Sequence, residues 1–212
     1  SVAFGLADRD GYMTHSFLKR SADDRRSVTG RGALYWKVDN TLQLRFGAFG
    51  EKIDDDATRL NSLFSPDPYT VASDLNGQTK LNRLQFSFQA KKKLNWGTVI
   101  ATTSRQDWDL NPAATDLDLS PQPLASSRVA QDEKLWTQEV RFESLPGANK
   151  TLWRAGVFVS DSKTGGDATR VFVVPPGAFV PPGFIQTEQT VFEIGQQSVA
   201  GYANFDHPLS KE

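Results

Sequence analysis

The chain has no cysteine, one methionine and two histidines among its 212 residues. The absence of cysteine excludes a disulfide scaffold. His15 and His207 lie far apart in the sequence, so we predict no metal site and no cofactor. Positive and negative charges are interspersed and sum to −1, which leaves no basic stripe for nucleic acid. These absences exclude a disulfide scaffold and argue against a zinc site, a haem site and a nucleic-acid-binding surface.

Long apolar runs are also missing. No stretch of about 18 apolar residues could form a transmembrane helix, and the first residues lack the pattern of a signal peptide. A membrane location stays open, because a transmembrane strand needs only about 9 to 11 alternating residues.

Catalytic motifs are missing too. There is no glycine-rich phosphate loop and no nucleophile elbow, so we expect no enzymatic activity. The acidic triplet Asp54 to Asp56 lacks the spaced ligands and the closing glutamate of a calcium loop, and we interpret it as a solvated loop.

The pattern that is present is alternation, and it is clearest in residues 82–107. One face of the first segment is apolar, with Leu84, Phe86, Phe88 and Ala90, and the other is polar, with Arg83, Gln85, Ser87 and Gln89. A period of two predicts a β-strand with one apolar face. Polar residues 91–95 interrupt the pattern before a second strand over 97–104, which predicts a hairpin.

The rest of the chain repeats this unit and predicts about eight strands. The first would be one long strand over residues 1–17, bulged at Gly11, followed by a charged loop over 19–26. Short turns are expected near Asn40, Lys93, Gly147 and Pro208. Loops of about 25 to 30 residues are expected at the opposite ends, over 52–80, 107–130 and 161–195.

This sorting of connections by length favours a membrane barrel. Soluble sandwiches carry connections of mixed length at both ends, whereas outer-membrane barrels have short turns on one side and long loops on the other. The sequence therefore predicts an all-β fold, an antiparallel up-and-down sheet of about eight strands that is a segment of a larger transmembrane β-barrel.

Tryptophans lie close to the predicted short turns. Trp36, Trp96 and Trp153, with Tyr35 and Tyr202, would fall in one ring. Aromatic girdles of this kind mark the membrane–water boundary of barrels, although core tryptophans at strand ends would give the same pattern.

Charged residues alternate with the apolar ones. Arg45, Arg83, Glu139 and Arg141 lie opposite the apolar faces. In a barrel they would face the wet lumen, and in a sandwich they would face solvent. Alternation alone leaves both possibilities open.

Several segments resemble a known family in their order and spacing. They are Asp10-Gly-Tyr12, Arg31-Gly-Ala-Leu34, Trp136-Thr-Gln-Glu-Val-Arg-Phe-Glu-Ser144, Leu152-Trp-Arg-Ala-Gly-Val-Phe158, and Ser198-Val-Ala-Gly-Tyr-Ala-Asn-Phe205 followed by Leu209-Ser-Lys211. Together they resemble the TonB-dependent receptors of the bacterial outer membrane, which import iron–siderophore complexes, cobalamin and other scarce nutrients.

The resemblance implies that residues 1–212 are a partial receptor barrel, without the family's plug domain and its remaining strands. It implies active transport of a scarce nutrient, such as an iron–siderophore complex, in the outer membrane. The implied partners are outer-membrane lipid, the nutrient, and the TonB energy-coupling complex acting through missing N-terminal parts. A soluble β-sandwich that binds carbohydrate or another ligand, and a smaller passive porin, are the alternatives.

Aromatic residues in the predicted long loops are the candidates for ligand binding, because loops on a rigid scaffold commonly carry function. They are Tyr69, Trp108, Phe179 and Phe184.

Overall fold

The computed structural model describes residues 1–56, 60–61, 65–147, 151–174 and 183–207. Its strands are β1 (Val2–Arg9), β2 (Met13–His15), β3 (Arg20–Ala22), β4 (Arg25–Lys37), β5 (Leu42–Asp55), β6 (Thr70–Val71), β7 (Gln78–Lys93), β8 (Gly97–Asp116), β9 (Ala125–Ser144), β10 (Leu152–Val173) and β11 (Ile185–Asp206). The described part of the chain contains no helix long and apolar enough to cross a membrane.

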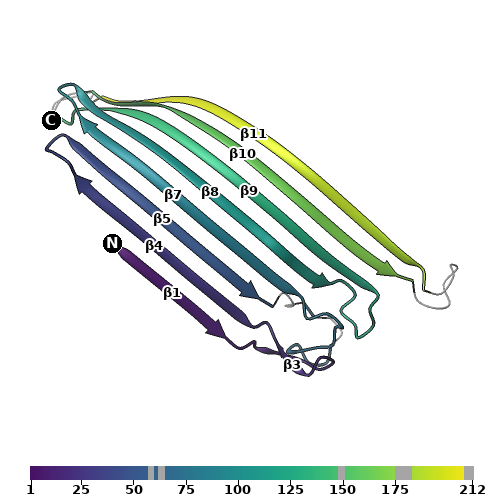
Figure 1. Cartoon of the computed structure of the whole chain (residues 1–212). Coiled ribbons are helices and arrows are strands. Elements are labelled where there is room, and N and C mark those ends of the chain that lie inside the picture. Colours follow the sequence, from purple (N-terminus) through teal and green to yellow (C-terminus); the bar gives the residue numbers. More distant parts are fainter. Residues whose placement is uncertain (57–59, 62–64, 148–150, 175–182, 208–212) are drawn as a thin grey trace.

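Eight of these strands form one antiparallel sheet in the order β1-β4-β5-β7-β8-β9-β10-β11 (Figure 1). Each strand pairs with the next one of the sheet along the chain, which confirms the predicted up-and-down topology. Strands β1 and β11 are the two edges and do not pair with each other, so the described residues form an open sheet. The other sheet in the described part, β3-β2-β6, is too small to complete a sandwich.

The connections lie at two ends of the sheet, as predicted, but their lengths differ from the prediction. At one end the gaps between strands are short: residues 38–41, 94–96 and 145–151. At the other end residues 10–24 and 56–77 are long and contain β2, β3 and β6, whereas 117–124 and 174–184 are much shorter than predicted. The turn expected near Pro208 lies outside the described residues.

The two later loops are short because their strands are long. Residues 107–116, 125–130, 161–173 and 185–195, predicted as loop, extend β8 to β11. Pairing continues along these extensions, for example between Asp107 and Lys134. Over 161–170 polar residues occupy both faces, so the apolar alternation that reveals a strand is lost while the backbone ladder persists. Over 107–110 the alternation is inverted, because Asp107 follows Arg105 on the face of Phe86 and Trp108 lies on the face of Arg83.

The N-terminal segment also departs from the prediction. Residues 1–17 are not one bulged strand, because β1 ends at Arg9 and β2 belongs to the small sheet. At Gly11 a Cβ would lie 1.5 Å from the carbonyl oxygen of Ala22, an approach that only glycine permits. The Gly11 amide donates to Asp24 Oδ1 at 2.6 Å. This contact turns the chain out of the main sheet, and the predicted charged loop 19–26 instead contains β3 and the start of β4.

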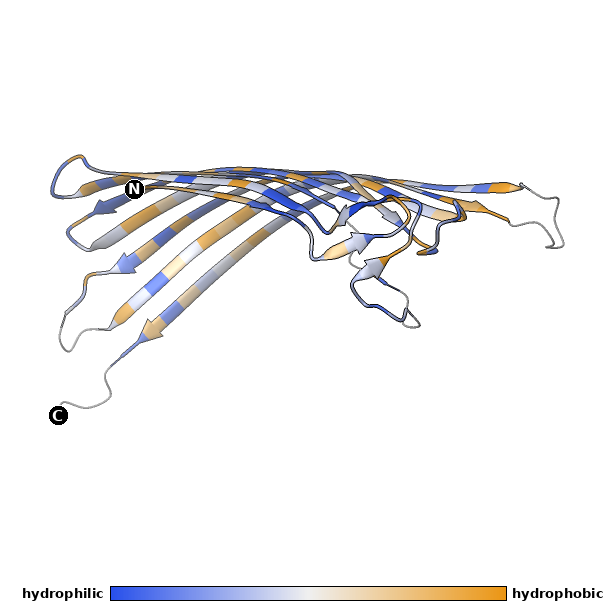
Figure 2. Cartoon of the chain, turned by 90° about the horizontal axis from the view of Figure 1, so that it is seen from below, coloured by the Kyte–Doolittle hydropathy of each residue, from blue (hydrophilic) through white to orange (hydrophobic). Residues whose placement is uncertain are grey.

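The register places apolar side chains in rows on one face of the main sheet. Leu34, Phe46 and Phe88 form one row, and the rings of Phe46 and Phe88 lie 4.8 Å apart. Along β5 this face is free of charge from Leu42 to Gly50. That length corresponds to about 30 Å of strand, or about 25 Å of bilayer once the strand is tilted. Figure 2 shows hydrophobic and hydrophilic residues alternating along the strands.

This apolar face is not covered by a core. The buried hydrophobic residues of the described part are Ala22, Val71 and Ile100. The chain exposes 14208 Å², whereas a compact soluble monomer of its mass exposes about 9,800 Å². Large side chains such as Phe86, 52% exposed, therefore require an apolar environment outside the chain.

Aromatic rings gather on the apolar face near the short gaps. Trp96 stacks on Trp153 with ring centroids 6.3 Å apart, and Phe142 lies at the same distance from Trp96. Tyr35 and Tyr202, predicted to join this ring, lie on the opposite face, in register with Arg45 and Arg141. Successive strand residues alternate between faces. The residues next to Tyr35 and Tyr202 in the sequence therefore point to the apolar side.

We predict that Phe88→Arg impairs membrane assembly of the intact parent protein, because the charge would sit within the apolar band at a cost of about 2 to 4 kcal/mol near the midplane. Gln85→Arg, on the polar face of the same strand, is the matched control and should be tolerated. The measurement is the amount of folded protein in the outer-membrane fraction. Equal tolerance of both changes would contradict the face assignment.

Residues 1–212 expressed alone should aggregate in water and become dispersed in detergent. Two unpaired strand edges and an uncovered apolar face cause this behaviour. Size-exclusion chromatography with and without detergent measures it. A monodisperse, detergent-free monomer with a cooperative melt would show that the exposed face is compatible with water.

Candidate functional site

The four predicted lumen residues share the polar face of the main sheet. Arg45 and Glu139 belong to one cross-strand row, through Gln89 and Thr102. Arg141 lies two residues beyond Glu139 on β9, and Arg83 lies in register with Glu51 and Trp108. That this face lines a lumen stays a prediction.

Opposite charges on this face are paired. Arg83 lies 3.8 Å from Glu51. Arg141 and Arg154 each lie 3.1 Å from Glu143, and Arg141 lies 3.9 Å from Glu139. Exposed pairs of this kind add little stability. These pairs do neutralise the long charged side chains of this face. Such side chains suit a wide, water-filled interior better than a packed one.

A close contact extends this network to the edge strand. The Tyr202 ring on β11 lies across Gly156 on β10, where a Cβ would come within 2.6 Å of the ring. The Tyr202 hydroxyl donates to Glu139 Oε1 on β9. Glycine at position 156 is therefore required for β11 to reach the charges of β9.

The predicted aromatic ligand residues are not brought together. Trp108 lies inside β8 and not in a loop, because the strand runs to Asp116. Tyr69, 65% exposed, precedes β6, and Phe184, 50% exposed, precedes β11. Phe179 lies outside the described residues. The ring contacts of the described part involve none of them.

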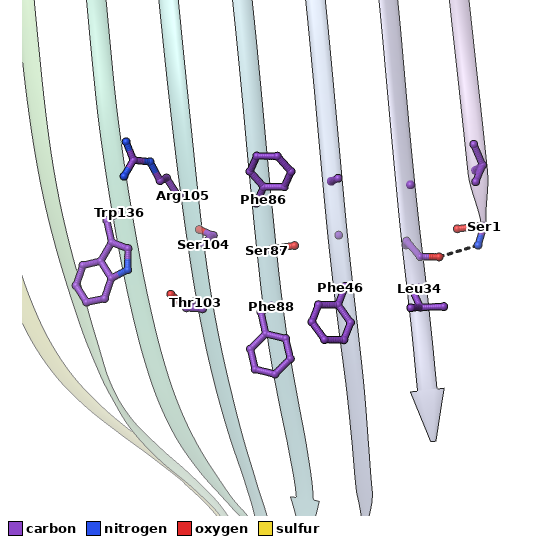
Figure 3. Close-up of a pocket in the computed structure, with 15 residues that line it drawn as sticks. Ser1, Leu34, Phe46, Phe86, Ser87, Phe88, Thr103, Ser104, Arg105 and Trp136 are labelled. Atoms are coloured by element: carbon purple, nitrogen blue, oxygen red, sulfur yellow. Dashed lines mark hydrogen bonds between the residues drawn. The ribbon is translucent and has the colours of Figure 1, made fainter. Parts of the chain in front are cut away.

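A hollow lies on the apolar face, and Arg105 is among the residues that line it. It measures about 790 Å³ and opens over Gly32 and Ala48, between larger side chains that include Phe46, Phe86 and Trp136 (Figure 3). This hollow lies on the face opposite the charged residues Arg45, Arg83, Glu139 and Arg141, so we do not assign it to a transported ligand.

A small cap lies beyond the long-connection ends of β1, β4 and β5 (Figure 1). It consists of β2, β3 and β6 and contains His15, which is fully buried. The Leu18 amide donates to His15 Nδ1 at 3.1 Å, so Nε2 carries the proton and donates to Ser73 Oγ at 3.0 Å. Ser73 Oγ in turn donates to the carbonyl of Leu75.

These bonds hold His15 in its neutral form. Burial lowers the pKa of His15, and the nearby Arg20 lowers it further against the opposing effect of Asp56. The backbone joins the same segments, since the Ser16 amide donates to the Val71 carbonyl at 2.8 Å. His15 therefore links residues 13–18 to residues 71–75. No sequence motif marked this buried histidine.

Three carboxylates meet near the cap. One oxygen from each of Asp74, Asp116 and Asp118 lies within 4.8 Å of the others. Asp116 is 1% exposed, and its Oδ1 accepts the amides of Asp118 and Leu119 at 3.0 and 3.1 Å. Burial raises the pKa of Asp116 to about 6, and the Asp118 carboxylate contributes to the rise.

The sequence interpretation missed this cluster and considered a different one. Asp54 and Asp55 end β5, so they are not in a solvated loop. Asp54, Asp55 and Asp56 pair with Lys80, Arg25 and Arg20 respectively. The signal that was available is the spacing Asp116-x-Asp118-x-Ser120, which resembles the start of a calcium loop.

Acidification should open the cap. A histidine whose pKa is lowered on folding stabilises the fold above its ordinary pKa of about 6.5 and loses that contribution as the pH falls toward the folded value. The local opening equilibrium of the intact parent should therefore rise by up to about tenfold per pH unit in that window. Hydrogen exchange at the Ser16 amide measures it.

The matched pair is His15→Gln and His207→Gln. We expect His15→Gln to abolish the histidine contribution to the pH dependence and His207→Gln, at the opposite end of the sheet, to preserve it. An unchanged pH profile in His15→Gln would show that His15 does not control the opening.

Comparison with known proteins supports the fold. No family model matches the chain. The crystal structure of the ferric yersiniabactin uptake receptor FyuA from Yersinia pestis matches with a TM-score of 0.64 and 10% identity, covering 99% of this chain and 39% of that one. The RagAB peptide transporter matches with a TM-score of 0.54 and 11% identity, covering 97% of this chain and 28% of that one.

The chain thus spans well under half the length of each matched structure. At these identities the likeness establishes the architecture and not the activity. The resemblance predicted from the sequence is confirmed at the level of the fold, which is an eight-stranded antiparallel sheet of the kind found in a segment of a larger β-barrel.

Proposed function

We propose that residues 1–212 form part of the barrel wall of an active-transport receptor in the outer membrane of a bacterium. The observation that carries the proposal is the open antiparallel sheet with one apolar and one charged face, which matches an uptake receptor over 99% of the chain. A transmembrane barrel wall requires this division of faces, since lipid contacts one side and water or protein the other.

The two ends of the sheet support an orientation. The short gaps, with Trp96 and Trp153 beside them, would face the periplasm. The cap and the extensions of β8 to β11 would face outward, because barrels of this type carry short periplasmic turns and longer external segments. In this orientation Tyr69 and Phe184 lie on the outer side, where a ligand would arrive.

The charged face would surround a plug supplied by other parts of the parent protein. Arg45, Arg83, Glu139 and Arg141 would line this interior. Coupling to the TonB complex would pass through N-terminal parts outside these residues. For the cargo we propose an iron–siderophore complex or another scarce nutrient; one matched structure is an uptake receptor for ferric yersiniabactin and the other is a peptide transporter.

Uptake measurements test this proposal. A strain lacking the parent gene should lose uptake of a labelled ferric siderophore, restoration of the gene should recover it, and a protonophore should abolish it. Uptake that resists the protonophore would support a passive porin. No gene-dependent uptake across a panel of ferric siderophores would reject siderophore import, and a peptide panel would then test the other cargo class.

The outer aromatic residues provide a second test. Tyr69→Ala should weaken ligand binding to the intact receptor, because it removes an exposed ring from the proposed outer mouth. Tyr35→Ala, a similarly exposed tyrosine at the opposite end, should leave binding unchanged. Equal affinities of the two variants would remove Tyr69 from the proposed binding surface.

A further inference from the structure

The acidic cluster joins two segments that are distant in the sequence. Asp116 ends β8, Asp118 lies in the connection to β9, and Asp74 lies in the connection before β7. The Asp74 amide donates to the Ser120 carbonyl at 2.9 Å, which holds the two connections side by side. Asp74 also follows Ser73, the hydrogen-bond partner of buried His15. The cluster therefore lies where the cap meets the β8–β9 connection.

The cluster carries three acids without a basic partner. Within the described residues, no lysine or arginine forms an ion pair with Asp74, Asp116 or Asp118, in contrast to Asp54, which pairs with Lys80. Three anionic oxygens within 4.8 Å of one another repel strongly unless a cation or protons lie between them.

One oxygen of Asp116 supplies independent evidence for a ligand. Its Oδ1 accepts two backbone amides, whereas Oδ2 is buried and has no hydrogen-bond donor among the residues that the structure describes. A buried carboxylate oxygen left without a partner loses the hydration it has in water. The two amides occupy Oδ1, so Oδ2 is the Asp116 oxygen that is available to bind a ligand at the cluster.

We propose that Asp74, Asp116 and Asp118 bind a calcium ion. Ligands bound to one ion at about 2.4 Å lie at most about 4.8 Å apart, which the three oxygens satisfy. The cluster offers only oxygen, and the chain has no cysteine, which favours a hard cation. Calcium accepts six to eight oxygen ligands in flexible geometry, so waters and nearby carbonyls complete the shell, whereas magnesium demands a near-ideal octahedron.

The spacing supports the same ion. Asp116, Asp118 and Ser120 occupy the first, third and fifth positions of a calcium loop. The closing glutamate of such a loop is replaced by Asp74 from a distant segment. The ion would therefore lock the cap to the β8–β9 connection, and this role is independent of whether the parent protein transports a nutrient.

Calcium titration of the full-length parent protein in detergent tests the proposal. After chelator treatment, CaCl2 should bind at one saturable site by calorimetry and raise the Tm in a concentration-dependent manner, with half-saturation no weaker than about 1 mM, the upper range of extracellular calcium modules. MgCl2 should bind at least tenfold more weakly. No saturable calcium binding by the folded protein, or equal affinity for magnesium, would overturn the assignment.

Three variants locate the site. Asp116→Asn should weaken calcium binding at least tenfold while the cap stays folded, because its amide can donate to Asp118. Asp74→Asn, at a less buried position, should weaken binding too, and Asp54→Asn is the matched control that should bind as the wild type does. Unchanged affinity in the first two variants would overturn the site.

Hydrogen exchange of the wild-type protein tests the site without any variant, and so gives a result even if the variants misfold. Calcium should slow exchange in residues 72–77 and 117–125. Protection confined to other segments would place the ion elsewhere and reject the cluster.

Discussion

Backbone hydrogen bonding between neighbouring strands is the interaction on which the main sheet depends. The sheet lacks the core of a soluble domain, since the buried hydrophobic residues of the described part are three and two of them, Ala22 and Val71, belong to the cap. The ladders instead run almost unbroken for up to 22 residues between β10 and β11. Paired backbone groups tolerate either lipid or water at the faces, so the same strands can leave the apolar band and continue as polar hairpins.

The ladder explains the difference between the two faces. Register forces all side chains of one row to the same side, so Leu34, Phe46 and Phe88 accumulate on one face, and Arg45 and Glu139 on the other. The apolar side gains from contact with lipid. On the polar side Arg83 and Arg141 are paired with carboxylates and need no packed interior. A closed barrel of only eight strands would have to fill its interior with side chains, which the paired long charges of this face do not favour.

The sequence predicted the parts of the fold in which one face contacts an apolar medium. Period-two alternation located the eight strands and the polar face, and the order of motifs led to the correct architecture. It failed where that contrast disappears or changes sides. Over 161–170 both faces carry polar residues, and over 107–110 the polar and apolar faces are exchanged. It also failed at Gly11, where the reason is a contact with Ala22 that no periodicity encodes.

The candidate sites were predicted less well, because they arise from tertiary contacts. Arg45, Arg83, Glu139 and Arg141 share a face, as strand periodicity required. Buried His15 lies in a short segment without a motif, and its partner Ser73 is 58 residues away. The acidic cluster had a local signal at Asp116 and Asp118, but its third member, Asp74, is brought there only by the fold.

The two ends of the molecule consequently depend on different interactions. The wall is held by backbone pairing, and its apolar face is left uncovered by the described residues. The cap is held by a few specific polar contacts that converge on adjacent residues. His15 is hydrogen-bonded to Ser73, and the Asp74 amide donates to the Ser120 carbonyl. Loss of either contact would free the same segment, residues 72–77, because these residues belong to no strand and follow only the two-residue β6. The end that carries the cap is thus the part whose order can change without disturbing the wall.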